Sequence, residues 1–170
     1  MKPVRTLALF AAGLAFSASV LAQAWPSKPI RMIVPYPPGG ATDILGRLIS
    51  AKLGPLINGQ VVVENKSGAS GNVGFDYVAK SAPDGYTLLM GTVGTHAING
   101  SLYSKMPYDT LKDFVPVAHI ASTPNLLVVN NDLPVKSVAE LITYLKANPN
   151  KLSFGSPGIG SSVHVSGELF

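Results

Sequence analysis

Four glycine-rich loops, each following a strand-like apolar run and preceding a helix-like stretch, are the part of this sequence best suited to bind a ligand. We call them the first elbow (residues 35–40), the second elbow (67–72), the third elbow (91–95) and the fourth elbow (155–162). In an open α/β sheet, the loops that follow the strands line one crevice. Helix N-termini in such a crevice present free backbone N–H groups at the positive end of the helix dipole. The elbows therefore predict a site for a small anion.

Glycine and hydroxyl residues of the elbows supply the expected hydrogen-bond donors. A carboxylate is bound well only when several donors are already oriented toward it. Glycine lacks Cβ, so its N–H group can approach a ligand closely and its φ can be positive. Any one of these loops also fits an ordinary α/β turn, and the four together favour a ligand. The predicted ligand-binding residues of this kind are Gly39, Gly40, Thr42, Ser70, Gly71, Thr92, Thr95, Ser156, Gly158, Gly160 and Ser161.

Four further residues beside the elbows are candidates for the same site. Asp43 is expected in the first turn of a helix, where a carboxylate caps free amides, and this structural role is favoured over ligand contact. Tyr36 either covers the methylene groups of a ligand or packs against the neighbouring prolines. His96 and His164 each lie just inside a helix after an elbow. A structural role is the default for both histidines, and ligand contact is the alternative.

Metal, cofactor and nucleophile motifs are missing from the sequence. The histidines have no HExxH spacing and the chain has no cysteine, so no metal site is predicted. Gly68, Gly71 and Gly74 lack the Gly-x-Gly turn of a dinucleotide loop, so no cofactor is predicted. An exported α/β hydrolase or lyase stays open as an alternative function. It requires a hydroxyl such as that of Ser161 within reach of a histidine ring.

The first 24 residues are typical of a cleaved secretory signal. Lys2 and Arg5 precede an apolar run over residues 7–16, and Ala22-Gln23-Ala24 matches a small-residue cleavage site. We expect cleavage after Ala24 and a periplasmic location. The apolar run is too short for a comfortable membrane anchor.

The charge and composition of the rest of the chain exclude some partners and set the source of stability. Without Lys2 and Arg5, eleven Lys and Arg face nine Asp and Glu, and the net charge falls from +4 to +2. The cations are scattered singly, so nucleic acid is not an expected partner. Since disulfides are impossible, stability must come from a core that a 46% apolar composition can supply.

Hydrophobic periodicity predicts a β-α-β-α-β unit at the start of the mature chain. Residues 30–35, 60–64 and 86–90 are expected as strands and residues 72–82 as a helix. A longer helix after the first elbow should carry an apolar stripe, and its right-handed crossovers would place helices on both faces of a parallel sheet. The stripe is predicted at Ile44, Leu45, Leu48, Ile49, Leu53 and Leu56.

The second half of the chain is predicted to contain a similar unit. A short helix is expected over 95–103, and strands over 115–120, 126–130 and 152–154. Ser137 and Glu140 form a capping box, whose hydroxyl and carboxylate should satisfy reciprocal backbone donors at a helix start. The segment 161–170 begins like a helix and ends without a C-cap, so we expect an incomplete polypeptide.

Six motifs, in order along the chain, resemble those of one family, the Bug-type solute receptors of tripartite tricarboxylate transporters. Together they extend over the whole segment from Trp25, and the chain would cover roughly the first half of a family member. The motifs are Trp25-Pro26-x-x-Pro29-Ile30, Tyr36-x-x-Gly39-Gly40-x-x-Asp43, Glu64-Asn65-Lys66-x-Gly68-Ala69-x-Gly71-Asn72, Pro83-Asp84-Gly85-Tyr86-Thr87, Tyr108-Asp109-x-x-Lys112-Asp113-Phe114 and Gly155-Ser156-x-Gly158-x-Gly160-Ser161-x-x-His164-x-x-x-Glu168.

The resemblance implies an α/β fold of the periplasmic-binding-protein type II class, with two lobes that close on a ligand. Residues 25–120 would form most of the first lobe, and residues 121–170 the interlobe crossing and the start of a truncated second lobe. The implied ligand is a small carboxylate and the implied partners are the membrane subunits of the transporter. A monomer without catalytic activity is expected. A receptor that signals to a membrane partner is a further alternative.

The same resemblance assigns ligand contacts to the elbows. The first lobe would contribute through Gly39, Gly40, Thr42 and the loops of Ser70 and Thr92. The second lobe would contribute through residues of the fourth elbow, namely Ser156, Gly158, Gly160 and Ser161.

Overall fold

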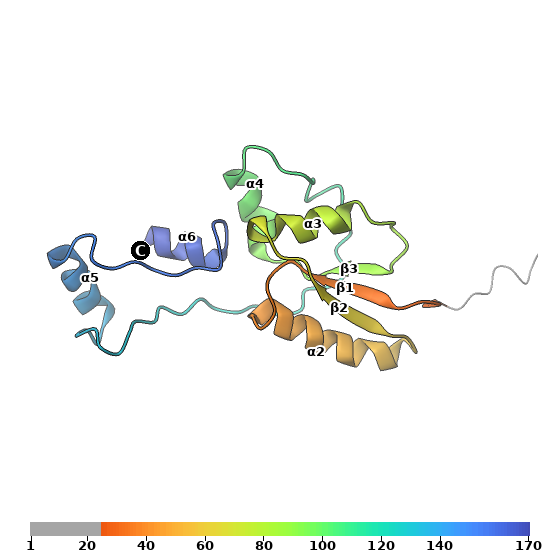
Figure 1. Cartoon of the computed structure of the whole chain (residues 1–170), viewed down its shortest axis with the longest axis horizontal. Helices are drawn as coiled ribbons and strands as arrows, with labels where there is room; N and C mark the ends of the chain where they lie inside the picture. The colour runs from red at the N-terminus through yellow and green to blue at the C-terminus, as the bar shows by residue number, and fades with distance from the viewer. Residues whose placement is uncertain (1–24) are drawn as a thin grey trace, which may run out of the picture.

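A parallel sheet organises the first part of the molecule (Figure 1). The computed structural model describes residues 25–170, and the predicted signal peptide lies outside them. The strands are β1 (Ile30–Val34), β2 (Val61–Asn65) and β3 (Thr87–Leu89), in the order β2-β1-β3. Ile30 is paired with Val61, and Arg31 with Thr87. The three strands predicted here are confirmed to within one or two residues at each end.

Helices cover both faces of this sheet, as predicted. Figure 1 shows α2 (Ala41–Leu56) on one face and α3 (Asn72–Ala79) on the other. Side chains of β1 alternate between the faces. Met32 and Val34 form a core with Met90, against which Leu45 of α2 packs. Arg31, of opposite parity, lies over the ring of Tyr77 in α3. The crossover through α2 and the crossover through α3 run on opposite faces of the sheet. Because β1 lies between β2 and β3, the two connections diverge at the carboxyl end of β1.

The buried face of α2 differs from the predicted apolar stripe. Its buried residues include Gly46, Ser50 and Gly54, whereas Ile44 and Leu48 are more than half exposed. A Cβ on Gly46 would lie 3.0 Å from Val34 Cγ2. The helix therefore approaches the sheet so closely that small residues fill the contact. Helical spacing identified the helix but assigned part of the wrong face to the core, because it ranks positions by hydrophobicity and not by size.

Short helical turns form part of the second and third elbows or directly follow them. These turns are η2 (Ala69–Gly71), the π-helical turn η3 (Gly94–Ile98) and α4 (Asn99–Leu102). The helix predicted over 95–103 is thus present, with a wider first turn. Below it, Phe75 is fully buried and its ring centroid lies 5.1 Å from that of Tyr108 and 5.2 Å from that of Phe114. This aromatic cluster anchors the chain up to Phe114.

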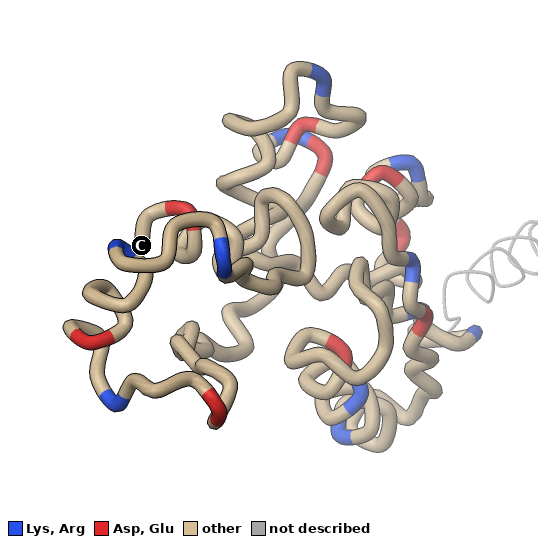
Figure 2. Tube along the Cα trace, turned by 60° about the vertical axis from the view of Figure 1, so that its left-hand side comes forward, with Lys and Arg blue, Asp and Glu red and all other residues tan. Residues whose placement is uncertain are grey.

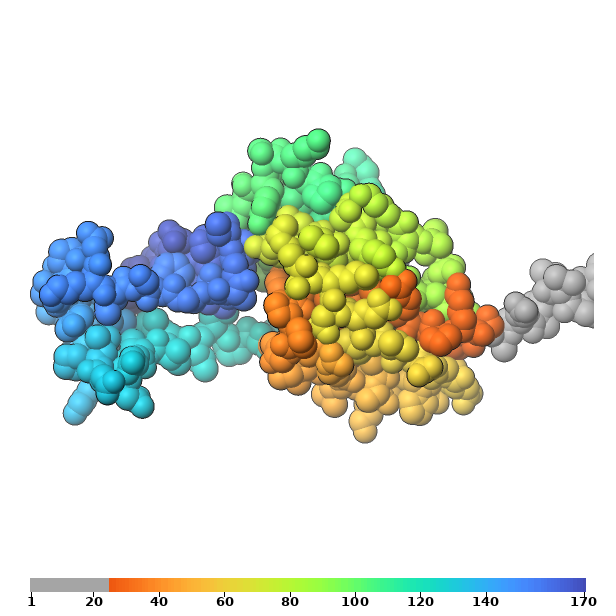
Figure 3. Space-filling model, viewed as in Figure 1, coloured from red at the N-terminus to blue at the C-terminus, as the bar shows by residue number. Residues whose placement is uncertain are grey.

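The chain beyond Phe114 has a different character. The strands predicted over 115–120, 126–130 and 152–154 are wrong for the described chain, because these segments form no ladder there. Val115, Val117, Leu126 and Val128 are at least 80% exposed. A strand needs a neighbour to satisfy its backbone groups and cover its side chains, and the pattern alone does not supply one. Figure 3 shows the later part of this segment, residues 126–150, extending away from the body formed by residues 25–114.

Two capped helices interrupt this extended chain, α5 (Val138–Ala147) and α6 (Ser162–Leu169). The Oγ atom of Ser137 accepts a hydrogen bond from the N–H of Glu140 at 3.2 Å, as predicted. The carboxylate of Glu140 accepts from the N–H of Lys136, at 2.7 Å, instead of from Ser137. None of the helices among residues 25–170 combines the length and apolar content needed to cross a membrane.

Candidate functional site

The first elbow leaves the start of α2 without a side-chain cap. Gly40 is the N-cap residue, and no side chain accepts a hydrogen bond from the first-turn amides there. Gly39 adopts φ +92°, and its N–H donates to Oδ2 of Asp43 at 2.9 Å. The N–H of Gly39 is therefore already engaged, whereas the first turn of α2 keeps the open donors that an anion can cap.

Asp43 holds the first elbow in place. It is 3% exposed and also accepts from Arg47 Nε at 3.0 Å and from Asn65 Nδ2 at 2.8 Å. These donors, with the Arg47 hydrogen bond first among them, keep the pKa of the Asp43 carboxyl well below its ordinary value. With both carboxylate oxygens occupied by protein donors, the structural role favoured by the sequence fits the geometry.

The third elbow is a compact network of hydroxyl groups. Oγ1 of Thr95 donates to the carbonyl of Thr92 at 3.1 Å and accepts from the N–H of Thr92 at 3.2 Å. Thr95 is fully buried. The Tyr36 hydroxyl lies 2.9 Å from Oγ1 of Thr92, and burial raises the pKa of that phenol. The first and third elbows are thus joined across the point where the two crossovers diverge, which is where open α/β sheets bind ligands.

The second elbow is held in a left-handed conformation. Ala69 and Ser70 have φ of +45° and +54°, and Gly71 follows with φ +94° as the N-cap of α3. No side chain caps the first turn of α3. A Cβ on Gly71 would lie 2.6 Å from Cγ2 of Thr95, so the second elbow touches the third.

The fourth elbow returns to the same place from the distal part of the chain. Oγ of Ser70 donates to the carbonyl of Ile159. A Cβ on Gly94 would lie 2.8 Å from the carbonyl oxygen of Gly160, whose own φ is +93°. Ser161 caps α6, with its Oγ accepting from the N–H of His164 at 3.1 Å. Ser156 lies at the exposed entry of the loop, with its Oγ 3.4 Å from the N–H of Gly158.

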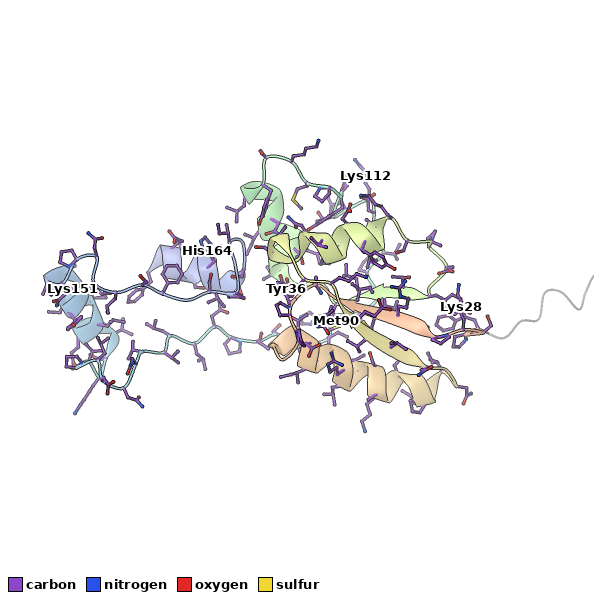
Figure 4. All side chains as sticks on the ribbon, viewed as in Figure 1. Lys28, Tyr36, Met90, Lys112, Lys151 and His164 are labelled. Atoms are coloured by element: carbon purple, nitrogen blue, oxygen red, sulfur yellow. The ribbon has the colours of Figure 1, made fainter. Side chains whose placement is uncertain are left out.

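All four elbows meet at the carboxyl end of the sheet. Figure 4 shows Tyr36 at this end of β1, with the α6 segment that carries His164 alongside. Contacts join the first elbow to the third, the third to the second, and the fourth to both the second and the third. The juxtaposition expected from the strand order is therefore present. It extends to the fourth elbow although no sheet forms in that part of the described chain.

The two histidine candidates lie in different surroundings. The ring of His96 packs edge-on against Phe75 at 4.9 Å between centroids, and burial lowers the pKa of the imidazole. This is the environment of a structural histidine. In His164, Nδ1 is buried without a hydrogen bond from the described residues, and Nε2 lies 3.8 Å from Glu168 Oε1. The Ser161 hydroxyl accepts from the backbone N–H of His164, and among residues 25–170 it bonds neither the His96 ring nor the His164 ring. The described Ser–His ring contact, between Ser122 Oγ and His119 Nε2 at 3.3 Å, lies away from the elbows.

No charged residue belongs to any of the four elbows. Figure 2 shows Lys, Arg, Asp and Glu scattered along the trace as isolated positions or pairs of opposite sign. Among residues 25–170, no group of three His, Cys, Asp or Glu is placed to hold a metal. The groups at the elbows that can attract an anion are therefore backbone N–H groups, hydroxyls and helix dipoles.

Sequence reasoning missed three buried polar residues that support the elbows, one of which, Asn72, is the last residue of the second elbow. Asn72, Asn99 and Tyr108 are buried and hydrogen-bonded to one another: Oδ1 of Asn72 accepts from Asn99 Nδ2 and from the Tyr108 hydroxyl, both at 2.8 Å. Burial raises the pKa of Tyr108 to about 12, so the phenol stays a donor. Asn72 and Tyr108 belong to the quoted motifs, which was the only signal available for them.

Comparison with known proteins decides the family. The family model described as "Tripartite tricarboxylate transporter family receptor" matches residues 45–170. This chain belongs to that receptor family. It is 41% identical over 165 residues to the protein BugT of Bordetella pertussis, a match that covers 96% of this chain and 51% of BugT. The Bug-type resemblance expected from the motifs is confirmed.

Solved structures of receptor-family relatives share the fold. The R. palustris protein Rpa4515, solved with adipate, superposes with a TM-score of 0.83 at 47% identity, over 85% of this chain and 48% of that one. MatC from Rhodopseudomonas palustris, solved with bound malate, gives a TM-score of 0.68 at 36% identity, over 72% of this chain and 42% of MatC. The predicted periplasmic-binding-protein fold class is confirmed. The chain spans about half the length of these relatives.

Proposed function

We propose that this chain is the N-terminal portion of a periplasmic receptor that binds a small carboxylate between two lobes and catalyses no reaction. One observation carries the proposal: the uncapped N-termini of α2 and α3 converge at one end of the sheet. A protein 47% identical to this chain was solved with a dicarboxylate, adipate. Both findings point to the same class of ligand.

Backbone donors would hold the carboxylate. One helix N-terminus stabilises a negative charge by only about 0.3–1 kcal/mol at an exposed site, so several must act together. Gly40, Thr42, Ser70 and Gly71 lie at the two uncapped N-termini, with the Tyr36–Thr92 hydroxyl pair beside them. The fourth elbow, through Ser156, Gly158, Gly160 and Ser161, would approach from the opposite side.

The remaining candidates would position the donors without touching the ligand. The N–H of Gly39 donates to the Asp43 carboxylate, Thr95 is buried in the third elbow, and the His96 ring packs against Phe75 of the aromatic cluster. His164 lies in the first turn of α6, and its N–H bonds Ser161 of the fourth elbow. It would therefore act on the ligand only by positioning that elbow.

We assign residues 25–120 to the first lobe, and residues 121–170 to the interlobe crossing and the start of the second lobe. The chain leaves the sheet after the aromatic cluster at Phe114, and α5 lies far from it in Figure 1. The Ser70–Ile159 hydrogen bond is then a contact between lobes. Delivery of the ligand to the membrane subunits of a tripartite tricarboxylate transporter is the cellular role that family membership favours.

Titration calorimetry on the full-length protein tests this function. Adipate and malate are the first ligands, followed by other small mono-, di- and tricarboxylates. Adipamide, which keeps the shape of adipate without its charges, is the matched control. We expect saturable binding of at least one carboxylate and none of adipamide. Failure of every carboxylate, or equal binding of adipamide, would contradict the proposal.

A further inference from the structure

Asn99, at the start of α4, is a fully buried polar residue between the second and third elbows. Its Nδ2 donates to Oδ1 of Asn72 at 2.8 Å and to the carbonyl of Ser70 at 3.3 Å. Both acceptors belong to the second elbow. The side chain therefore links the helix that follows the third elbow to the backbone of the second.

The acceptor end of the same amide faces the fourth elbow. A Cβ on Gly160 would overlap Oδ1 of Asn99. That oxygen is buried and accepts no hydrogen bond from residues 25–170. The oxygen therefore occupies the space that a Cβ on Gly160 would need. The two ends of one planar amide thus touch two elbows, the second and the fourth, and the residue itself begins the helix that follows the third.

The backbone of the second elbow needs such a restraint. Ala69 and Ser70 are consecutive non-glycine residues with positive φ, a conformation that persists only when the surroundings impose it. Nδ2 of Asn99 donates to the carbonyl of Ser70, and the Ser70 hydroxyl donates to the carbonyl of Ile159. Loss of the amide would release the loop from the side that faces the third elbow.

We propose that Asn99 is a positioning residue that sets the spacing of the second, third and fourth elbows, and that Gly160 is glycine because this spacing leaves no room for a Cβ. The inference rests on the proposed function insofar as these elbows hold the ligand. The placement of the elbows themselves can be tested without any ligand.

Tyr108 provides the matched control. Its hydroxyl donates to the same Asn72 oxygen at 2.8 Å and to the carbonyl of Thr95 at 3.0 Å. Among the described residues, these bonds reach neither Ser70 nor Gly160. Tyr108→Phe therefore weakens the buried network but leaves the contact with the fourth elbow in place.

The first experiment measures amide hydrogen exchange of the full chain without ligand. Asn99→Ala should speed exchange in the fourth elbow, including the Ser161 N–H that bonds the carbonyl of Gly158, roughly tenfold more than Tyr108→Phe does. Equal effects of the two variants on the fourth elbow would overturn the inference. If Asn99→Ala does not fold, Gly160→Ala replaces it: exchange in the second elbow must then rise, and an unchanged second elbow would overturn the inference.

A double-mutant cycle with adipate is the second experiment. Gly160→Ala should weaken adipate binding roughly tenfold more in the wild-type background than in the Asn99→Ala background, because the side chain that the new Cβ overlaps is then absent. The cost of the positive φ is the same in both backgrounds and cancels. Additive effects would contradict the role of Asn99. If the wild type does not bind adipate, the proposed carboxylate ligand is contradicted. The exchange experiment would still show whether Asn99 positions the elbows.

Discussion

Residues 25–114 and residues 115–170 begin their helices in opposite ways. In the first region, α2 and α3 start at Gly40 and Gly71, and no side chain caps them. In the second region, α5 and α6 start at Ser137 and Ser161, whose hydroxyls cap them. The helices on the sheet are stabilised by packing and can leave their first turns open. The exposed helices depend on local caps, because little tertiary contact supports them.

The two regions also differ in how apolar side chains are covered. Ile30, Ile33, Val34 and Phe75 are fully buried, while a series of valines and leucines between residues 115 and 130 is exposed. A core residue should therefore contribute much more to stability in the first region than a residue of the same type in the second.

The largest effect we expect is the loss of an aromatic core residue. Phe75→Ala should lower the free energy of unfolding by about 3–5 kcal/mol, because it removes a fully buried ring from a packed cluster. Phe154→Ala, which removes a half-exposed ring, should cost about 1 kcal/mol or less. Urea unfolding followed by circular dichroism measures both. Similar losses would erase the distinction between the two regions.

The second largest difference in stability between the two regions is expected from glycine substitutions. Gly71→Ala places a Cβ against Thr95 at a residue with φ +94°, and should cost about 3 kcal/mol. Gly155→Ala, whose Cβ meets no atom within 4 Å, should change stability by less than about 0.5 kcal/mol. Thermal unfolding of both variants under one condition checks this. A tolerated Gly71→Ala would show that the second and third elbows are not in contact.

An open helix start should matter for binding and not for folding. Gly40 has a negative φ and open space around it, so Gly40→Asp should alter stability by only a few tenths of a kcal/mol. The new carboxylate should cap α2 itself and repel an anionic ligand, weakening adipate binding at least about tenfold. Gly100→Asp, also in open space, is the control in the binding assay. Unchanged affinity in Gly40→Asp would remove α2 from the site.

The smallest expected effect is the response to acid. The folded-state pKa of Asp43 is depressed, so its contribution to stability is present above the unfolded pKa of about 4 and is lost as the pH falls toward the folded value. We expect the wild type to lose more stability between pH 5 and pH 3 than Asp43→Asn does. Urea midpoints at the two pH values test this. Parallel losses would assign the acid sensitivity to other groups.

The contrast between the regions also explains what the sequence could predict. Capping signals at Ser137 and Ser161 act locally, and both helices start where expected. The strands of the first region were predictable because each has a neighbour in the sheet. Identical reasoning failed at 115–130, where apolar runs have no partner in the described chain and register cannot be established.

For the site, composition identified the loops but not their supports. Glycine and hydroxyl residues marked the four elbows, and the strand order then predicted their meeting at one edge. The role of Asn99 could not be predicted, because nothing in the sequence distinguishes a buried asparagine that links two loops from any other asparagine in a helical stretch. Likewise, spacing does not reveal that the N–H of Gly39 and the hydroxyl of Thr95 already donate within the protein.

The most direct test of the account is an amide chemical-shift titration of the full-length protein with adipate. We expect the backbone amides of the first, second and fourth elbows, including Gly40, Gly71 and Gly158, to shift together along one saturation curve, while the amides of α5 do not move. Shifts confined to a single elbow, or a saturable response centred on α5 with silent elbows, would contradict it.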